Sequence, residues 1–171
     1  SRSSRPSSVP SAISLVVILA AIAAALVQHD VTGPCPPGLA ITPLVFFVRI
    51  AALAVGGLIL LVNWHQPAAQ ERGEYMAMVL FALLGVLLTA AANDLLVLFF
   101  AIELVSVPTY VLVGLSRADS RAPEAAVKYF FLGALASAVL AYGMSFLYGA
   151  AGTTTIRAIA DTGLDTALAG A

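Results

Sequence analysis

The sequence predicts an all-α membrane protein, a polytopic bundle of five transmembrane helices followed by a short interfacial segment. Its 171 residues are 61% hydrophobic and only 10% charged, with a mean hydropathy of +1.00. A soluble domain carries about 25% charged residues. Five apolar runs separated by short polar stretches approach or exceed the roughly 17 residues that a spanning helix needs. Composition and segment length therefore both place most of the chain inside a bilayer.

The predicted organisation has three parts. Residues 1–10 form a polar lead rich in serine, proline and arginine, and residues 150–171 form an amphipathic tail that is too short and too polar to span a membrane. A positively charged lead before a short apolar run also resembles a signal peptide, but the later spans count against cleavage. The membrane domain occupies residues 11–149, with spans at about 11–27, 41–62, 75–92, 95–114 and 124–149.

The ends of these spans carry suitable residues. The second closes near Trp64, which suits the headgroup level of a membrane. The third ends before Asn93, and Asp94 can cap the helix that begins immediately afterwards. The fifth opens with Pro123 and Glu124, which favour a helical first turn. Only a tight turn is therefore expected between the third and fourth spans.

Glu103 lies near the middle of the fourth predicted span, on the order of 12 Å from its start. A carboxylate at that depth must be protonated, paired or exposed to a wet cavity. Ser106 and Tyr110 follow on the same helix face, which makes a narrow polar stripe. Pro108 has no N–H and leaves one carbonyl of the preceding turn without its helical donor. These four residues are candidate site residues.

Two cations also fall within predicted spans. Lys128, the only lysine, lies about one turn into the fifth span, and Glu124 precedes it at the favourable i, i+4 spacing. Arg49 lies near the middle of the second span, either as a structural charge or as part of an ion path. A glutamate near a lysine can exchange protons as their separation changes. Alternatively, Glu103 and Lys128 form a structural ion pair, or Lys128 extends to the membrane surface.

Other kinds of site are not indicated. The sequence has no glycine-rich phosphate loop, no nucleophile elbow and no cysteine or histidine ligand set, so it suggests neither a catalytic residue nor a metal or cofactor site. Its single cysteine, Cys35, excludes an intramolecular disulfide. A net charge of −1 gives no reason to expect nucleic-acid binding.

Arginines outside the predicted spans favour a cytoplasmic N-terminus. With five spans in alternation, one side of the membrane receives five arginines and the other receives only Arg157. The five are Arg2, Arg5, Arg72, Arg117 and Arg121.

Two motifs in the second half are together specific. They are Glu103-Leu-Val-Ser-Val-Pro-Thr-Tyr-Val-Leu-Val-Gly114 and Glu124-Ala-Ala-Val-Lys-Tyr-Phe-Phe-Leu-Gly-Ala-Leu-Ala-Ser137. They resemble the N-type antiporter-like membrane subunit of proton-pumping NADH:quinone oxidoreductase, respiratory complex I. The resemblance runs with few gaps from about Gly73 to Ile156, while the first two spans resemble the family only in hydropathy and order.

The resemblance implies a part of a 14-helix antiporter-like fold with two inverted repeats, in which these spans are helices two to six. It implies that Glu103 is the acidic member of a coupling pair and that Lys128 is a lysine of a proton half-channel. The broken helix, its lysine and the second repeat are missing, so we expect a piece of a longer chain. NADH, FMN, iron–sulfur clusters and quinone would be bound by partner subunits in a bacterial cytoplasmic membrane, with no cofactor on this chain.

Two alternatives stay open. The chain could belong to a multisubunit cation/proton antiporter or a membrane-bound hydrogenase, although the residues after Glu103 favour the N-type subunit. It could also be a non-transporting membrane scaffold whose charges are structural.

Overall fold

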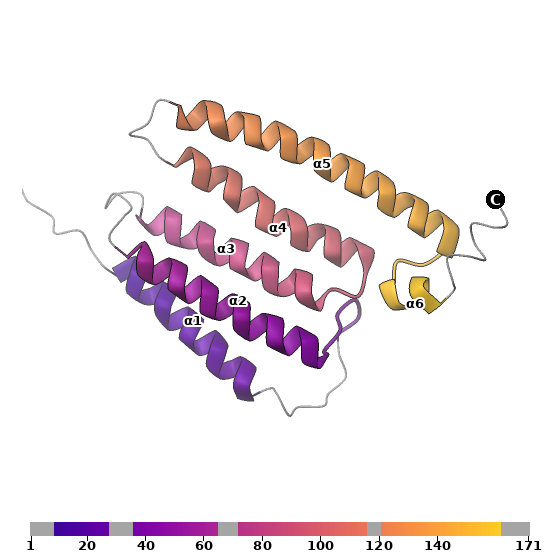
Figure 1. Ribbon diagram of the computed structural model, residues 1–171, viewed down its shortest axis with the longest axis horizontal. Helices are drawn as coiled ribbons and strands as arrows, with labels where there is room; N and C mark the ends of the chain where they lie inside the picture. The colour runs from indigo at the N-terminus through magenta and orange to yellow at the C-terminus, as the bar shows by residue number, and fades with distance from the viewer. Residues whose placement is uncertain (1–8, 28–35, 65–71, 116–120, 162–171) are drawn as a thin grey trace, which may run out of the picture.

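The computed structural model describes residues 9–27, 36–64, 72–115 and 121–161, and within these ranges every named element is a helix (Figure 1). The first five helices are long and apolar enough to cross a membrane, as predicted. They are α1 (Val9–Val27), α2 (Pro43–Val62), α3 (Arg72–Ala91), α4 (Leu95–Gly114) and α5 (Ala122–Ala151), followed by the short α6 (Ile156–Asp161).

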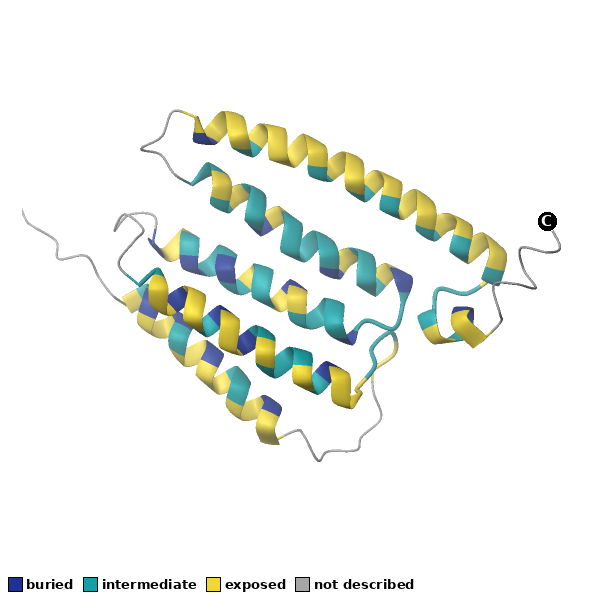
Figure 2. Cartoon of the chain, in the orientation of Figure 1, coloured by how far each residue is buried: buried dark blue, intermediate teal, exposed yellow. Residues whose placement is uncertain are grey.

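The helices are arranged in sequence order, with α5 at one edge of the row and α1 and α2 at the other (Figure 1). Helix α1 packs on both α2 and α3, α4 packs on α3, and the main neighbour of α5 is α4. A buried apolar cluster joins the first three helices through Ile18, Leu53, Leu60, Met76 and Val79. By contrast, Ala122 is the only residue of α5 that is buried, and the helix is almost entirely exposed in Figure 2.

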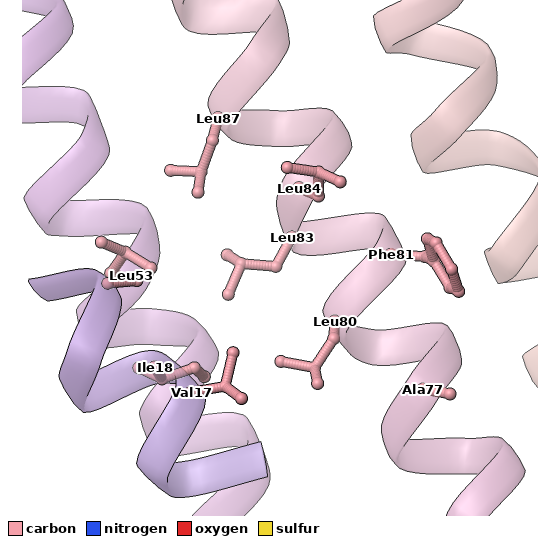
Figure 3. A pocket seen from close by; sticks show the side chains of 10 residues that line it. Val17, Ile18, Leu53, Ala77, Leu80, Phe81, Leu83, Leu84 and Leu87 are labelled. Atoms are coloured by element: carbon pink, nitrogen blue, oxygen red, sulfur yellow. The ribbon is translucent and has the colours of Figure 1, made fainter. Parts of the chain in front are cut away.

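A groove of about 370 Å³ lies between α1, α2 and α3 (Figure 3). Its walls are aliphatic and aromatic side chains, including Ile18, Leu53, Leu80 and Phe81. No ionisable side chain lines it. Proton or ion chemistry must therefore be sought on the other side of α3.

The observed helix ends differ from the predicted ones by a few residues. Helix α2 begins at Pro43 because the Thr42 side chain caps it, accepting a hydrogen bond of 3.2 Å from the Val45 amide. Helix α3 begins earlier than predicted, at Arg72, which is buried rather than part of a loop. Helix α5 has 30 residues, or about 45 Å, which exceeds a hydrocarbon core of roughly 30 Å. The polar lead before residue 9 and the tail after residue 161 lie outside the described residues.

The turn between α3 and α4 is hydrogen-bonded on both sides. On one side, the Asn93 amide donates to the Gly38 carbonyl (2.8 Å). On the other, the Leu95 amide donates to the Thr154 carbonyl, also at 2.8 Å. Asp94 caps α4 as predicted, accepting from two amides of the first turn, and its carboxylate also accepts from the Thr154 hydroxyl. The segments before α2 and after α5 thus fix the start of α4.

Candidate functional site

Glu103 is the ninth residue of the twenty in α4, close to the middle of the helix, as the sequence predicts. It is partly buried, and its carboxylate accepts a hydrogen bond from the Ser137 hydroxyl of α5. Glu103 also lines a groove of about 390 Å³ between α3 and α4, together with Met78, Phe81 and Pro108. The Glu103 side chain therefore lies between the Ser137 hydroxyl on one side and a mainly apolar groove on the other.

Sequence reasoning missed Ser137 as a site residue. It recurs with Gly133, Ala141 and Ser145 at every fourth position, a spacing that indicates close helix packing. The available signal was a hydroxyl in this row of small residues, on the helix that follows the one carrying Glu103. The partner of that hydroxyl could be known only from the relative register of α4 and α5.

Helix α4 approaches its two neighbours at glycines. A Cβ on Gly85 of α3 would lie 2.7 Å from the Val105 amide nitrogen, so only glycine allows this approach. On the other side, a Cβ on Gly133 of α5 would lie 1.8 Å from the Tyr110 hydroxyl oxygen. These two glycines allow α4 to lie close to α3 on one side and to α5 on the other.

The predicted polar stripe on α4 does not converge on Glu103. The Ser106 hydroxyl donates to the Ile102 carbonyl of its own helix at 3.0 Å. The Thr109 hydroxyl donates to the Ser106 carbonyl at 2.6 Å, within the helical turn that contains Pro108. Pro108 itself is buried inside the helix. Ser106 and Pro108 thus shape the backbone next to Glu103 and do not bind its carboxylate.

Tyr110 projects from α4 onto α5. Its ring meets that of Tyr129 edge to face, with centroids 4.8 Å apart and an interplanar angle of 89°. Phe130 lies 5.8 Å away in the same kind of contact. The hydroxyl lies over Gly133, one helical turn before Ser137. Tyr110 therefore fills the seam between α4 and α5 beside the Glu103 site.

Lys128 pairs with Glu124 on its own helix, as their spacing predicts. The two side chains are 73% and 67% exposed. Lys128 precedes Ser137 by nine residues, which corresponds to about 13.5 Å along the helix and two and a half turns. It therefore points away from the α5 face that meets Glu103. Among the described residues no direct ion pair joins Glu103 and Lys128, so that hypothesis is wrong for this structure.

Arg49 is the seventh residue of α2, counted from Pro43, and is nearer the helix end than the sequence suggested. It is partly buried. Helix α3 packs against both α2 and α4. Within the described part of the chain no ion pair links Arg49 to Glu103 or to another acid. The structure gives Arg49 no place beside the carboxylate.

The described residues contain no cluster of three or more histidine, cysteine, aspartate or glutamate side chains that could hold a metal ion. The site consists instead of one carboxylate at the middle of a spanning helix, one hydroxyl donor and an aromatic seam beside them. Such an arrangement can take up and release a proton.

Comparison with known proteins finds a family model that matches the second half of the chain. Residues 92–169 match a family model described as NADH:quinone oxidoreductase/Mrp antiporter, TM. The matched range contains Glu103, Ser137 and Lys128.

Individual relatives narrow the assignment within that family. A subunit N 1 of NADH-quinone oxidoreductase from Solibacter usitatus is 38% identical over 140 residues, covering 80% of this chain and 29% of the relative. The chain is similar to subunit N over most of its own length. Subunit N from Geobacillus kaustophilus is 41% identical over 115 residues, which cover 67% of this chain and 23% of that protein. The chain thus spans less than a third of the curated relatives it matches.

Solved structures share the fold. Respiratory complex I from Thermus thermophilus with bound aureothin contains a chain that superposes with a TM-score of 0.73 at 29% identity, covering 85% of this chain and 32% of that one. A chain of the membrane-bound sulfane sulfur reductase, an archaeal respiratory membrane complex, superposes with a TM-score of 0.77 at 23% identity. The match covers 91% of this chain and 35% of the reductase chain. At 23% identity the likeness shows a shared fold alone. The five helices are thus a recurrent part of larger membrane subunits.

Proposed function

We propose that this chain is part of a proton-translocating membrane subunit of NADH:quinone oxidoreductase, in which Glu103 takes up and releases a proton during turnover. The similarity to subunit N supports the assignment to this complex. The position of Glu103 at the middle of α4 supports its role in proton transfer. The observation that carries the proposal is a carboxylate at the middle of a spanning helix with Ser137 as its hydrogen-bond donor.

The physical basis is the cost of charge at this depth. An ionised carboxylate in a low-dielectric interior is unfavourable unless a positive charge, hydrogen-bond donors or water stabilise it. One hydroxyl supplies only part of that stabilisation. A positive charge that moves nearby, or water that enters the adjoining groove, therefore decides whether Glu103 holds its proton.

Lys128 acts in this proposal as a second charge, on the face of α5 turned away from Glu103. Its pairing with Glu124 directs its ammonium group toward the N-terminal end of α5. It would exchange partners with groups that pack on the outer face of α5, and its influence on Glu103 would be electrostatic rather than by contact. NADH, FMN, iron–sulfur clusters and quinone belong to partner subunits, and the reaction there supplies the driving force.

The proposed location is a bacterial cytoplasmic membrane with the N-terminus of this chain in the cytoplasm. The excess of arginines on that side supports this orientation. Cys35, the single cysteine, then lies on the outer side. A membrane-impermeant maleimide should label Cys35 in intact cells. A variant with Cys35→Ser and Arg121→Cys should be labelled only after permeabilisation, and the reverse pattern would contradict the orientation.

The function is tested in the full-length chain within its native complex, in membrane vesicles. Glu103→Gln keeps the size and hydrogen bonding of the side chain but cannot carry the charge. We expect assembly to survive and proton pumping per assembled complex to fall by at least tenfold, an amount that general acid–base groups commonly contribute. Glu74→Gln, the same substitution in the first turn of α3, is the matched control and should pump normally.

Lys128→Ala should give a smaller loss than Glu103→Gln, because Lys128 is exposed and distant from the carboxylate. The scaffold alternative predicts a different pattern, in which both substitutions reduce assembly and leave pumping per assembled complex unchanged. The antiporter alternative predicts pH-gradient-driven cation exchange without NADH. Either result would refute the proposal.

A further inference from the structure

A cleft lies on the α4–α5 seam, and Tyr110 is its lining residue nearest in sequence to Glu103 on α4. It has a volume of about 640 Å³ and lies at the end of the seam where α4 finishes and α5 begins. Gly114 and Ala126 line its outer part, and Tyr110 and Phe130 line its inner part. Beyond Tyr110, one further turn of α5 leads to Ser137, which donates to Glu103. The Tyr110 ring is therefore the side chain between the cleft and the carboxylate.

The fit of Tyr110 is specific. Its hydroxyl occupies the space that a Cβ of residue 133 would need, so the ring can lie there only because that residue is glycine. Two edge-to-face contacts hold the ring, one with Phe130, which lines the cleft, and one with Tyr129, which does not. All three contacted residues lie between Lys128 and Ser137 in α5. The ring therefore lies on the seam about one helical turn before Ser137.

We propose that Tyr110, seated over Gly133, is a gate that closes the cleft from the Glu103–Ser137 pair, and that displacement of its ring admits water to the carboxylate. The gate is steric. The Tyr110 hydroxyl makes no hydrogen bond within the described part of the chain, so a fixed hydroxyl relay is not what the geometry supports. The inference deepens the proposed function and rests on it, because a gate matters only if Glu103 exchanges protons.

The test uses the full-length chain assembled in its complex in sealed vesicles. The first readout is the decay of an imposed pH gradient without NADH, and the second is NADH-driven pumping. Tyr110→Ala removes the ring, and Gly133→Ala displaces it, since the new Cβ would lie 1.8 Å from the hydroxyl oxygen. Both should speed the decay at least threefold and lower the steady gradient while NADH oxidation continues. Tyr110→Phe keeps the ring and should behave like the native protein.

Two further variants sharpen the test. Phe131→Ala removes an aromatic side chain that lines the same cleft but is 67% exposed, and it should cause no leak. Adding Glu103→Gln to Tyr110→Ala should abolish the leak, because the route ends at that carboxylate. Should Tyr110→Ala fail to assemble, Tyr110→Leu keeps an apolar side chain too short to lie over Gly133 and should also leak.

Several results would overturn the gate. One is a gradient decay as slow as that of the native protein in both Tyr110→Leu and Gly133→Ala. Another is a leak in Tyr110→Phe or Phe131→Ala as fast as that in Tyr110→Ala. The third is a Tyr110→Ala leak that persists after Glu103→Gln is added. Failure of the proposed function looks different, because Glu103→Gln alone would then pump like the native protein. A deficient Glu103→Gln together with tight Tyr110→Leu and Gly133→Ala vesicles would refute only the gate.

Discussion

The contacts among helices α1 to α3 differ in kind from those between α4 and α5. The first three share a buried cluster centred on Leu53 and Leu60, and their groove is entirely apolar. In α4 and α5 the notable contacts are polar or aromatic, namely Glu103 with Ser137 and Tyr110 with the residues around Gly133. Helix α5 buries almost nothing of its own length. Buried apolar contacts therefore hold the first three helices together, whereas the pair α4 and α5 carries the carboxylate that we propose exchanges protons.

The largest expected effect breaks the apolar half. Leu60 is 0% exposed in the core cluster, whereas Leu58 on the same helix is 61% exposed. Leu60→Ala should destabilise the protein by about 2–5 kcal/mol through cavity formation, whereas Leu58→Ala should cost much less. Thermal unfolding of the purified complex and the amount assembled in membranes measure the difference. Equal losses from the two substitutions would show that the core does not lie between α1 and α3.

A second prediction compares glycines in the two halves. Gly85→Ala should cost about 1–3 kcal/mol, because its Cβ would meet the backbone of α4 at 2.7 Å. Apart from the nearby backbone of α5 itself, no atom lies within 4 Å of a Cβ built on Gly143, so Gly143→Ala should be neutral or slightly stabilising. Both variants are compared by thermal unfolding. A comparable loss from Gly143→Ala would show that another segment packs tightly on α5.

The turn at Asp94 joins the two halves and gives a smaller, pH-dependent effect. The hydrogen bond from Thr154, together with two backbone amides of α4, holds the pKa of Asp94 below its ordinary value of 3.8. A carboxyl whose pKa is lowered by folding stabilises the protein above the unfolded-state value, and that stabilisation is lost as pH falls through the folded-state value. Asp94→Ala should therefore cost about 1 kcal/mol near pH 7 and less in acid.

Unfolding measured between about pH 7 and pH 3 checks this prediction. Thr154→Val removes only the side-chain bond to Asp94 and should give part of the same loss. An Asp94→Ala penalty that stays constant across the pH range would mean that the carboxylate charge does not stabilise this turn.

The smallest effect belongs to the exposed pair on α5. Glu124 and Lys128 are each about two-thirds or more exposed, and surface pairs at this spacing contribute roughly 0.2–0.5 kcal/mol. Glu124→Gln should leave thermal stability within that range. A loss above about 1 kcal/mol would place the pair inside a packed interface of the complex.

Sequence patterns located the helices because hydropathy and capping are local properties. The turn at Asn93 and the cap at Asp94 could be predicted, and so could the pairing of Glu124 with Lys128. The partner of Glu103 could not, because it depends on the register between two helices of similar apolar composition. A shift of one turn would place Gly133 rather than Ser137 opposite the carboxylate. Once the register places Ser137 opposite Glu103, the nine-residue spacing from Lys128 to Ser137 puts Lys128 on the other face of α5.

The central claim is that Glu103 changes its protonation during turnover, and infrared difference spectroscopy of the native complex tests it most directly. Spectra recorded before and after NADH addition, with isotope-labelled glutamate, should contain a carboxyl C=O band that changes on turnover. The band should be missing in Glu103→Gln and retained in Glu74→Gln. A spectrum unchanged by Glu103→Gln would contradict the account and leave Glu103 as a structural residue.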